Sequence, residues 1–106
     1  MNIQYKKGVL ELCVLALLHA KDMYGYEVSE RLSKQIDIAD GTVYPILRKL
    51  KGDGLVTTYL SEDSQGPPRK YYSLTSAGKK AYLADREEYL GFARIVETLL
   101  EERTHG

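Results

Sequence analysis

The chain has few of the residues from which several common functional sites are built. Its 106 residues include one cysteine, two histidines and no tryptophan. The single cysteine, Cys13, excludes an internal disulfide and is typical of the reducing cytoplasm, where we expect the protein. His19 and His105 are far apart, and no cysteines or carboxylates cluster near them at ligand spacing, so no metal site is predicted.

The patterns of common catalytic, cofactor and membrane sites are also missing. Gly52 and Gly54 flank one residue and are not followed by Lys-Ser or Lys-Thr, so they form no phosphate-binding loop. No serine or cysteine stands near a recognisable base and acid, so the chain is not expected to be an enzyme, and no cofactor is predicted. The apolar run at residues 9–18 follows two lysines as in a signal peptide. Glu11 interrupts it, and it is shorter than the roughly 20 residues that span a bilayer, so no membrane partner is expected.

Charge is balanced over the whole chain but not along it. Fifteen basic and fifteen acidic residues give a formal net charge of zero. Arg48, Lys49 and Lys51 lie close together, and Arg69 and Lys70 are adjacent. The end of the chain is acidic instead, with Glu97, Glu101 and Glu102 against Arg103. Any affinity for a polyanion must therefore come from local basic patches rather than from bulk charge.

Residues 40–51 read as a short helix around which the chain is organised. Its apolar residues recur at helical spacing and form one face: Val43, Ile46, Leu47 and Leu50. Asp40 is the predicted N-cap, and Gly54 permits the left-handed turn that ends a helix. Hydroxyls, a phenol and cations occupy the rest of the surface, which suits a DNA major groove. The alternative is an ordinary amphipathic helix with a solvated basic face.

The flanking segments suggest a helix-turn-helix followed by a hairpin. Residues 9–18 predict a helix that is apolar nearly all round, and residues 24–33 predict a second helix before the organising one. Residues 56–60 are β-branched and aromatic, residues 61–68 are turn-like, and residues 69–74 read as a returning strand. Such a hairpin is a wing whose Arg69 and Lys70 can reach phosphates or the minor groove. A plain hairpin with a charged edge is the alternative.

A last helix is predicted from Thr75 or Ser76, either of which can cap it, to about Glu102. Its apolar surface is broader than a small core needs, so a partner subunit is the simplest cover, although the helix could pack on its own domain instead. The predicted dimer-interface residues are Leu10, Val14, Leu17, Tyr82, Tyr89, Phe92, Val96 and Leu99. Residues 1–75 would form the DNA-binding domain and residues 76–106 the dimerisation helix, within one compact unit.

Three segments, in order, resemble the PadR family of winged-helix transcriptional regulators. Residues 24–27, Tyr-Gly-Tyr-Glu, resemble the start of that family's second helix. Residues 41–47, Gly-Thr-Val-Tyr-Pro-Ile-Leu, with Leu50 and residues 54–56, resemble its recognition helix and exit. Residues 66–72, Gly-Pro-Pro-Arg-Lys-Tyr-Tyr, with residues 74–75 and Gly78, resemble its wing and the start of its last helix. The resemblance spans nearly the whole chain, and the short single C-terminal helix is like that of the smaller PadR subgroup.

The resemblance implies a homodimer joined through its first and last helices, which represses transcription by binding an operator and is released by a ligand or stress signal. Some members of the smaller subgroup stack flat aromatic compounds on tryptophan at the dimer centre, whereas this chain has no tryptophan. A small aromatic effector would meet residues of the first and last helices. The candidate ligand-binding residues are Leu12, Leu15, Tyr89, Phe92 and Val96. A closed interface without a ligand is the alternative.

The expected fold is α+β and mainly α: a winged helix-turn-helix with a two-stranded wing and a C-terminal dimerisation helix. The expected function is sequence-specific binding of double-stranded DNA at a near-palindromic operator. A winged-helix protein–protein interaction module without specific DNA binding remains the rival, because fold does not determine function. The predicted DNA-binding residues are Tyr24, Tyr26, Thr42, Tyr44, Arg48, Lys49, Lys51, Arg69 and Lys70. For Tyr24 and Tyr26, packing in the core is an equally open role.

Overall fold

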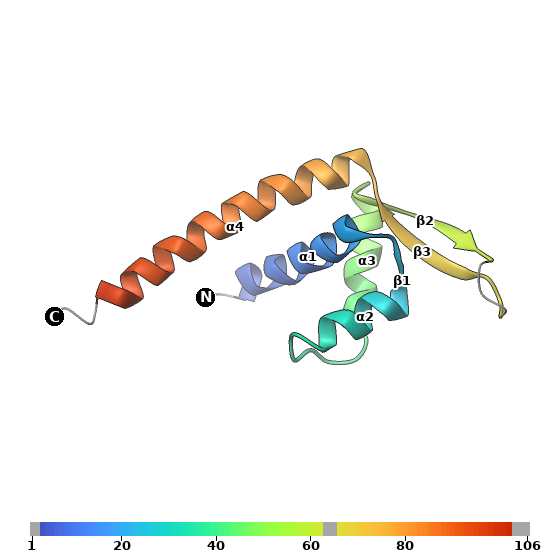
Figure 1. The fold of residues 1–106 in the computed structure, drawn as a ribbon, viewed down its shortest axis with the longest axis horizontal. Coiled ribbons are helices and arrows are strands. Elements are labelled where there is room, and N and C mark those ends of the chain that lie inside the picture. The colour runs from blue at the N-terminus through green and yellow to red at the C-terminus, as the bar shows by residue number, and fades with distance from the viewer. Residues whose placement is uncertain (1–2, 63–65, 103–106) are drawn as a thin grey trace.

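The computed structural model (Figure 1) describes residues 3–62 and 66–102, with side chains from residue 8 on, and contains four helices and a small antiparallel sheet. The elements, in chain order, are α1 (Ile3–Ala20), β1 (Met23–Tyr24), α2 (Gly25–Ser33), α3 (Val43–Gly52), β2 (Val56–Ser61), β3 (Arg69–Leu74) and α4 (Ser76–Glu102). This architecture confirms the predicted mainly α winged helix-turn-helix with a C-terminal helix. The predicted turn at residues 61–68 lies partly outside the described residues.

The sheet contains the two strands of the predicted wing, β2 and β3, and a third strand that was not predicted. Its order is β1-β3-β2, and both pairings are antiparallel. The third strand, β1, pairs Met23 with Tyr72 and Tyr24 with Tyr71. A strand of two residues is too short to show the alternation by which strands are recognised in sequence, so only the fold reveals it. It attaches the start of α2 to the base of the wing.

The start of α3 differs from the prediction. The helix begins at Val43, and Thr42, at the N-cap position, already has helical backbone angles and makes no side-chain cap hydrogen bond. Asp40 is therefore not the cap. The chain enters the helix through Gly41, whose φ is +83°, a conformation that glycine adopts without strain. Pro45 falls inside the first turn, where its missing N–H breaks no helical hydrogen bond.

The end of α3 follows the predicted glycine turn. Gly54 has φ +76°, and its N–H donates to the carbonyl of Lys51 at 3.0 Å. The N–H of Leu55 donates to the carbonyl of Leu50 at 2.9 Å. These two bonds make a Schellman motif, which satisfies carbonyls that the last turn would otherwise leave open. They also direct the chain into β2.

The hydrophobic core is built from α1, α2, α3 and the sheet. Its buried members are Val14, Leu15, Leu18, Met23, Val28, Leu32, Val43, Leu47, Leu50, Val56, Tyr72 and Leu74. Full burial of such a side chain contributes about 1.5–3 kcal/mol, so these contacts dominate the stability of the fold. Val14 is 0% exposed within the protomer. Its side chain is therefore already covered by its own domain, unlike the predicted dimer-interface residues of α4.

The beginning of α4 is held to the end of α3 through Thr75. Its Oγ1 accepts the N–H of Gly78 at 3.0 Å, which confirms Thr75 as the cap, and donates to the carbonyl of Gly54 at 2.7 Å. Its own N–H donates to the carbonyl of Leu55 at 3.1 Å. Gly78 is buried, and a Cβ at that position would overlap the carbonyl oxygen of Leu55. Close backbone approach therefore requires a glycine here.

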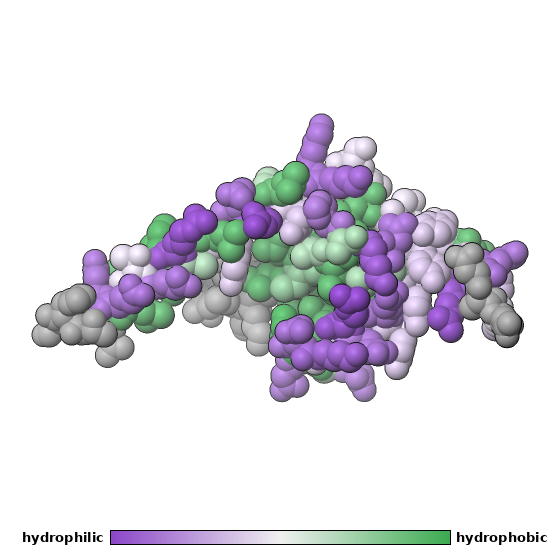
Figure 2. All heavy atoms as spheres, in the orientation of Figure 1, coloured by the Kyte–Doolittle hydropathy of each residue, from purple (hydrophilic) through white to green (hydrophobic). Residues whose placement is uncertain are grey.

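From this anchor, α4 runs antiparallel along α1 and then continues past it as a projecting arm, while the β2–β3 hairpin extends from the opposite side of the molecule (Figure 1). Large apolar side chains on the arm remain exposed, among them Ile95 at 59%, Leu99 at 58% and Leu100 at 61%. Hydrophobic residues are visible on the arm between hydrophilic ones (Figure 2). Within the described residues, no helix has both the length and the apolar character needed to cross a membrane.

Candidate nucleic-acid interface

An open recess of about 700 Å³ lies where the wing meets the starts of α2 and α3. Tyrosines and cations line most of it. Six of the nine predicted DNA-binding residues are brought together there, namely Tyr24, Tyr26, Tyr44, Arg48, Arg69 and Lys70, together with Gly25 and Tyr72. These residues come from β1, α2, α3 and β3, so only the folded chain assembles them.

All the charged residues that line the recess, among the described residues, are cations. Arg48, Arg69 and Lys70 contribute three cations, and no acidic side chain lines the recess with them. In the described part of the chain, no carboxylate makes a salt bridge with any of the three. Like charges gathered without counterions attract a polyanion, and tyrosine hydroxyls beside them can hydrogen-bond phosphate oxygens.

Tyr44 of α3 packs against the start of α2 with one side of its ring. The ring of Tyr44 lies directly over Gly25, and a Cβ added to Gly25 would stand 2.7 Å from its Cε1 atom. Tyr44 nevertheless remains 46% exposed. The absence of a side chain at Gly25 therefore brings α3 and α2 together, with one side of the ring packed and the rest available to a partner.

A second tyrosine of the recess is enclosed by other rings and one cation. The guanidinium carbon of Arg69 lies 4.6 Å from the ring centroid of Tyr24. The ring of Tyr26 stacks on it at 6.4 Å and 16°, and the ring of Tyr71 meets it edge-on at 5.7 Å and 62°. Tyr24 is half-buried, whereas Tyr26 is 61% exposed. The two tyrosines of the Tyr-Gly-Tyr segment therefore occupy different environments.

Three predicted DNA-binding residues do not line the recess: Thr42, Lys49 and Lys51. Thr42 is half-buried at the N-cap of α3, and Lys51 is exposed in its last turn. The Nζ of Lys49 pairs with Asp53 at 3.2 Å and with Glu11 of α1 at 3.4 Å. Hydrogen bonds to Asp53 and the charge of Glu11 raise the pKa of Lys49 above its ordinary value. Lys49 therefore faces α1, on a different side of α3 from Arg48.

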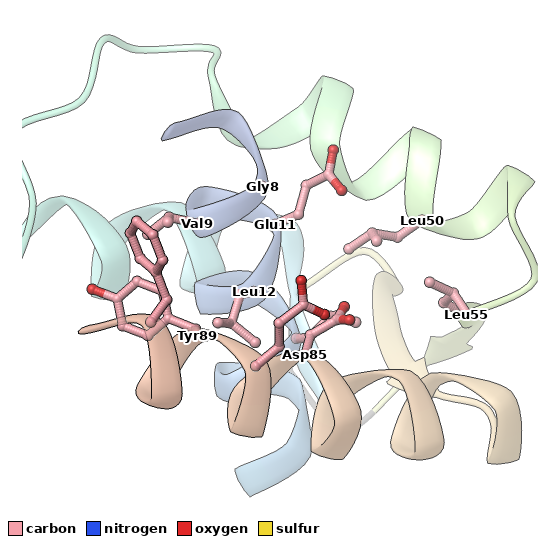
Figure 3. A pocket seen from close by; sticks show the side chains of 11 residues that line it. Gly8, Val9, Glu11, Leu12, Leu50, Leu55, Asp85 and Tyr89 are labelled. Carbon is pink, nitrogen blue, oxygen red and sulfur yellow. The ribbon is translucent and has the colours of Figure 1, made fainter. Parts of the chain in front are cut away.

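A second concavity, of about 380 Å³, lies between α1, α3 and α4. Four predicted ligand-binding residues, Leu12, Leu15, Tyr89 and Phe92, line it, but Val96 does not. The sequence analysis missed its carboxylates, Glu11, Asp85 and Glu88. Asp85 precedes Tyr89 by one helical turn along α4, and Glu88 precedes Phe92 in the same way. This helical spacing was the one sequence signal that could have placed Asp85 and Glu88 beside the predicted ligand-binding residues. Figure 3 shows Glu11 directed toward α3, with Asp85 and Tyr89 rising from α4.

Known proteins share both the sequence pattern and the fold. The transcriptional regulator PadR-like family matches residues 14–84. The chain is 29% identical over 96 residues to the transcriptional regulator Rv3488 of Mycobacterium tuberculosis, covering 88% of this chain and 87% of that protein. It is 29% identical over 76 residues to the negative transcriptional regulator PadR of Bacillus subtilis, covering 68% of this chain but only 42% of that protein.

Crystal structures of two further proteins superpose on nearly the whole chain. A PadR-like transcriptional regulator from Bacillus cereus has a TM-score of 0.83 at 33% identity, with 92% of this chain and 96% of that chain covered. A Streptococcus transcriptional regulator has a TM-score of 0.85 at 33% identity, with 92% and 98% covered. Sequence match, element order and fold agree, and the chain belongs to the PadR-like family of transcriptional regulators.

Proposed function

We propose that the protein regulates transcription by binding a specific double-stranded DNA operator, with α3 in the major groove and the wing against the neighbouring backbone. The observation that carries this proposal is the recess in which Arg48, Arg69 and Lys70 converge beside exposed tyrosines. Arg48 and Tyr44 project from the recognition helix, where side chains can reach base edges. Arg69 and Lys70 lie on the wing, where they can neutralise phosphates.

Equilibrium binding to DNA at a series of salt concentrations tests this function. Operator candidates would first be selected from random DNA with the purified protein and then measured by fluorescence anisotropy between about 50 and 200 mM salt. Affinity should fall steeply with salt for every sequence, because phosphate contacts release counterions, and selected sequences should stay tighter than random DNA. A protein–protein module without specific DNA binding would select no sequence. Failure to bind any DNA at low salt would contradict the proposal.

The same proposal includes a homodimer formed through α1 and the arm of α4. The exposed apolar side chains of the arm support it, because contiguous apolar surface is costly to leave in water. Of the predicted interface residues, Phe92, Val96 and Leu99 are 45%, 36% and 58% exposed. Leu10, Leu17, Tyr82 and Tyr89 are half-buried in the protomer, and the ring of Tyr82 packs against that of His19 at 4.7 Å, tilted by 32°. Among the predicted interface residues, those of the arm are therefore more exposed than those of α1.

A dimer would place two recognition helices about 34–36 Å apart, so the selected operator should be a near-palindrome with half-sites one turn apart. Sedimentation at micromolar concentration should find dimers of the wild type. Replacing Phe92 and Val96 by Asp should give monomers or insoluble chains, since each charge would be buried unpaired. The control replaces Arg86 and Glu87, whose side chains pair with each other at 3.0 Å, by alanine. A folded wild-type monomer would contradict the dimer.

We further propose that the regulator is a repressor released by a small aromatic effector in the pocket between α1, α3 and α4. Apolar walls suit an aromatic ligand, and the three carboxylates favour a cation over an anion. Glu11 lines this pocket and also pairs with Lys49 of α3, and Leu50 of α3 lines it too, so an occupant would touch the recognition helix. An effector would release DNA only by favouring the DNA-incompetent arrangement.

Two ions of the same shape and opposite charge test this second proposal. Tetraphenylphosphonium and tetraphenylborate would be titrated into the protein–operator complex while DNA release and tyrosine fluorescence are followed. The cation should bind and release DNA, the anion should not, and Glu11→Gln should weaken the response to the cation. Equal binding of both ions would contradict the role of the carboxylates. Binding without a change in operator affinity would make the pocket incidental to regulation.

A further inference from the structure

The ring of Tyr24 holds a wing cation in place before any partner arrives. The guanidinium of Arg69 lies over the ring face, at 4.6 Å from the centroid. The stacked ring of Tyr26 and the edge of Tyr71 surround the same ring. A half-buried ring that is contacted by three other side chains has little room to swing toward a DNA strand.

Strand register explains why this cation and this ring meet. Tyr24 is the last residue of β1 and pairs with Tyr71 of β3. Arg69 precedes Tyr71 by two residues, so both side chains project from the same face of the sheet as Tyr24. A residue two positions from the directly paired one is a diagonal neighbour, within reach of a long side chain. Because β1 ends at Tyr24, Arg69 lies beyond the short strand and folds back onto the ring.

The surrounding rings are themselves anchored across the sheet. Tyr59 of β2 pairs with Tyr71 in the register, and their rings stack at 5.7 Å and 15°. The hydroxyl of Tyr59 then donates to the carboxylate of Asp22, just before β1, at 2.7 Å. This bond connects the outer strand of the wing to the residue that precedes the opposite edge strand. The aromatic row fixes the orientation of Tyr24 from the wing side.

We propose that Tyr24 is a positioning residue that acts through its ring, holding the Arg69 guanidinium at the recess beside Arg48 and Lys70. This inference rests on the proposed DNA-binding function and gives Tyr24 an indirect role in place of the predicted direct contact with DNA. Three cations close together repel one another, and a free arginine side chain also loses rotamer freedom when DNA immobilises it. A cation–π contact made in advance reduces both costs, which is preorganisation of the binding site.

Four variants separate the ring from the hydroxyl: Tyr24→Phe, Tyr24→Leu, Arg69→Ala and the double variant that combines Tyr24→Leu with Arg69→Ala. Tyr24→Phe keeps the ring and should bind the selected operator like the wild type. Tyr24→Leu should bind about two- to five-fold more weakly, the factor expected from an exposed cation–π contact. Adding the leucine substitution to Arg69→Ala should cause no further loss, because the cation that the ring holds is then absent. Thermal unfolding would verify that all four variants fold.

A measurement on the free protein tests the same contact without DNA. The side-chain protons of Arg69 that lie over the aromatic face should show an upfield ring-current shift in NMR spectra, identified by their loss in Arg69→Ala. The shift should persist in Tyr24→Phe and disappear in Tyr24→Leu. A wild-type protein that showed this shift but bound no DNA would contradict the proposed function while leaving the contact itself demonstrated.

Three outcomes would overturn the inference while leaving DNA binding intact. Loss of affinity in Tyr24→Phe as large as in Tyr24→Leu would assign the effect to the hydroxyl. Independent, additive losses in the double variant would show that Tyr24 acts apart from Arg69. Unchanged Arg69 signals in Tyr24→Leu would show that the ring does not hold the guanidinium in solution.

Discussion

The two concavities of this protein lie on different faces of α3 and carry opposite charge. Tyr44 and Arg48 of α3 line the recess, which contains three cations and, among the described lining residues, no acidic side chain. Leu50 of α3 lines the pocket, which contains the carboxylates of Glu11, Asp85 and Glu88 and, among the described lining residues, no basic side chain. A net charge of zero therefore conceals a segregated surface, and local charge rather than bulk charge identifies the candidate DNA side.

A glycine allows close approach beside each concavity, but the two glycines meet different neighbours. Gly78 of α4 faces the backbone carbonyl of Leu55, while Gly25 of α2 faces the movable, exposed ring of Tyr44. Backbone cannot move aside cheaply, whereas the end of an exposed side chain can. The same substitution should therefore affect stability on the pocket side and DNA binding on the recess side.

The largest effect is expected from Gly78→Ala. The added methyl group would overlap the Leu55 carbonyl oxygen and separate α4 from the end of α3. Overpacking of this kind should cost about 3 kcal/mol or more, measured by urea or thermal unfolding. Gly52→Ala is the matched control, because a Cβ added at Gly52 would have no atom near it and alanine is the better helix former. The stability of this variant should therefore not fall. Equal stability of the two variants would contradict the tight α3–α4 junction.

The next largest effect should separate two adjacent cations of α3. Arg48→Ala should cost about 1–3 kcal/mol on the selected operator, because Arg48 lines the recess and can read a base. Lys49→Ala should change operator affinity far less, since Lys49 pairs with Glu11 and Asp53 instead. Fluorescence anisotropy with operator and random DNA gives both values. Equal loss on both DNAs for Arg48→Ala would make it a phosphate contact, and a large loss for Lys49→Ala would contradict the separation of the two faces.

Gly25→Ala should weaken DNA binding with little loss of stability. Its methyl group would stand 2.7 Å from Cε1 of Tyr44 and would push the ring out of its packed position. We expect a loss of operator affinity of roughly 1 kcal/mol, comparable with an off-rotamer side chain at the interface. In a Tyr44→Ala background, adding Gly25→Ala should neither raise nor lower operator affinity further. If Gly25→Ala also weakened binding in that background, the effect would lie in α2 rather than in Tyr44.

The smallest effect is expected at the ion pair between Glu11 of α1 and Lys49 of α3. Glu11→Gln should lower stability by about 0.5 kcal/mol, because the pair is partly exposed and screened by salt. The pKa of Lys49 is raised above its ordinary value of 10.5 by Asp53 first and then by Glu11. The contribution of these pairs is therefore complete at neutral pH and is lost as pH rises through that raised value. The free energy of unfolding should be measured for wild type and Glu11→Gln at pH 7 and pH 11. The difference between the two proteins should be smaller at the higher pH.

Much of the architecture could be predicted because it is encoded locally. The span of β3, the Gly54 turn and the Thr75 cap each depend on residues within a few positions of one another. The Asp40 cap failed because Gly41 enters the left-handed region, and that choice depends on how the loop must join α2 to α3. The two-residue strand β1 could not be predicted, since its partner β3 is distant in sequence and the pairing leaves no local pattern.

The sequence by itself determined the helical periodicity, the wing, the segregation of basic residues and the resemblance to a family, because each is a pattern of residue type along the chain. Only the tertiary structure decided that Arg48 lines the recess while Lys49 faces α1, and that Val14 is covered by its own domain. Only the fold placed Glu11, Asp85 and Glu88 around one pocket and brought Arg69 over Tyr24. Periodicity shows which residues share a face of a helix or strand, but the element that covers that face is chosen by packing between segments distant in sequence.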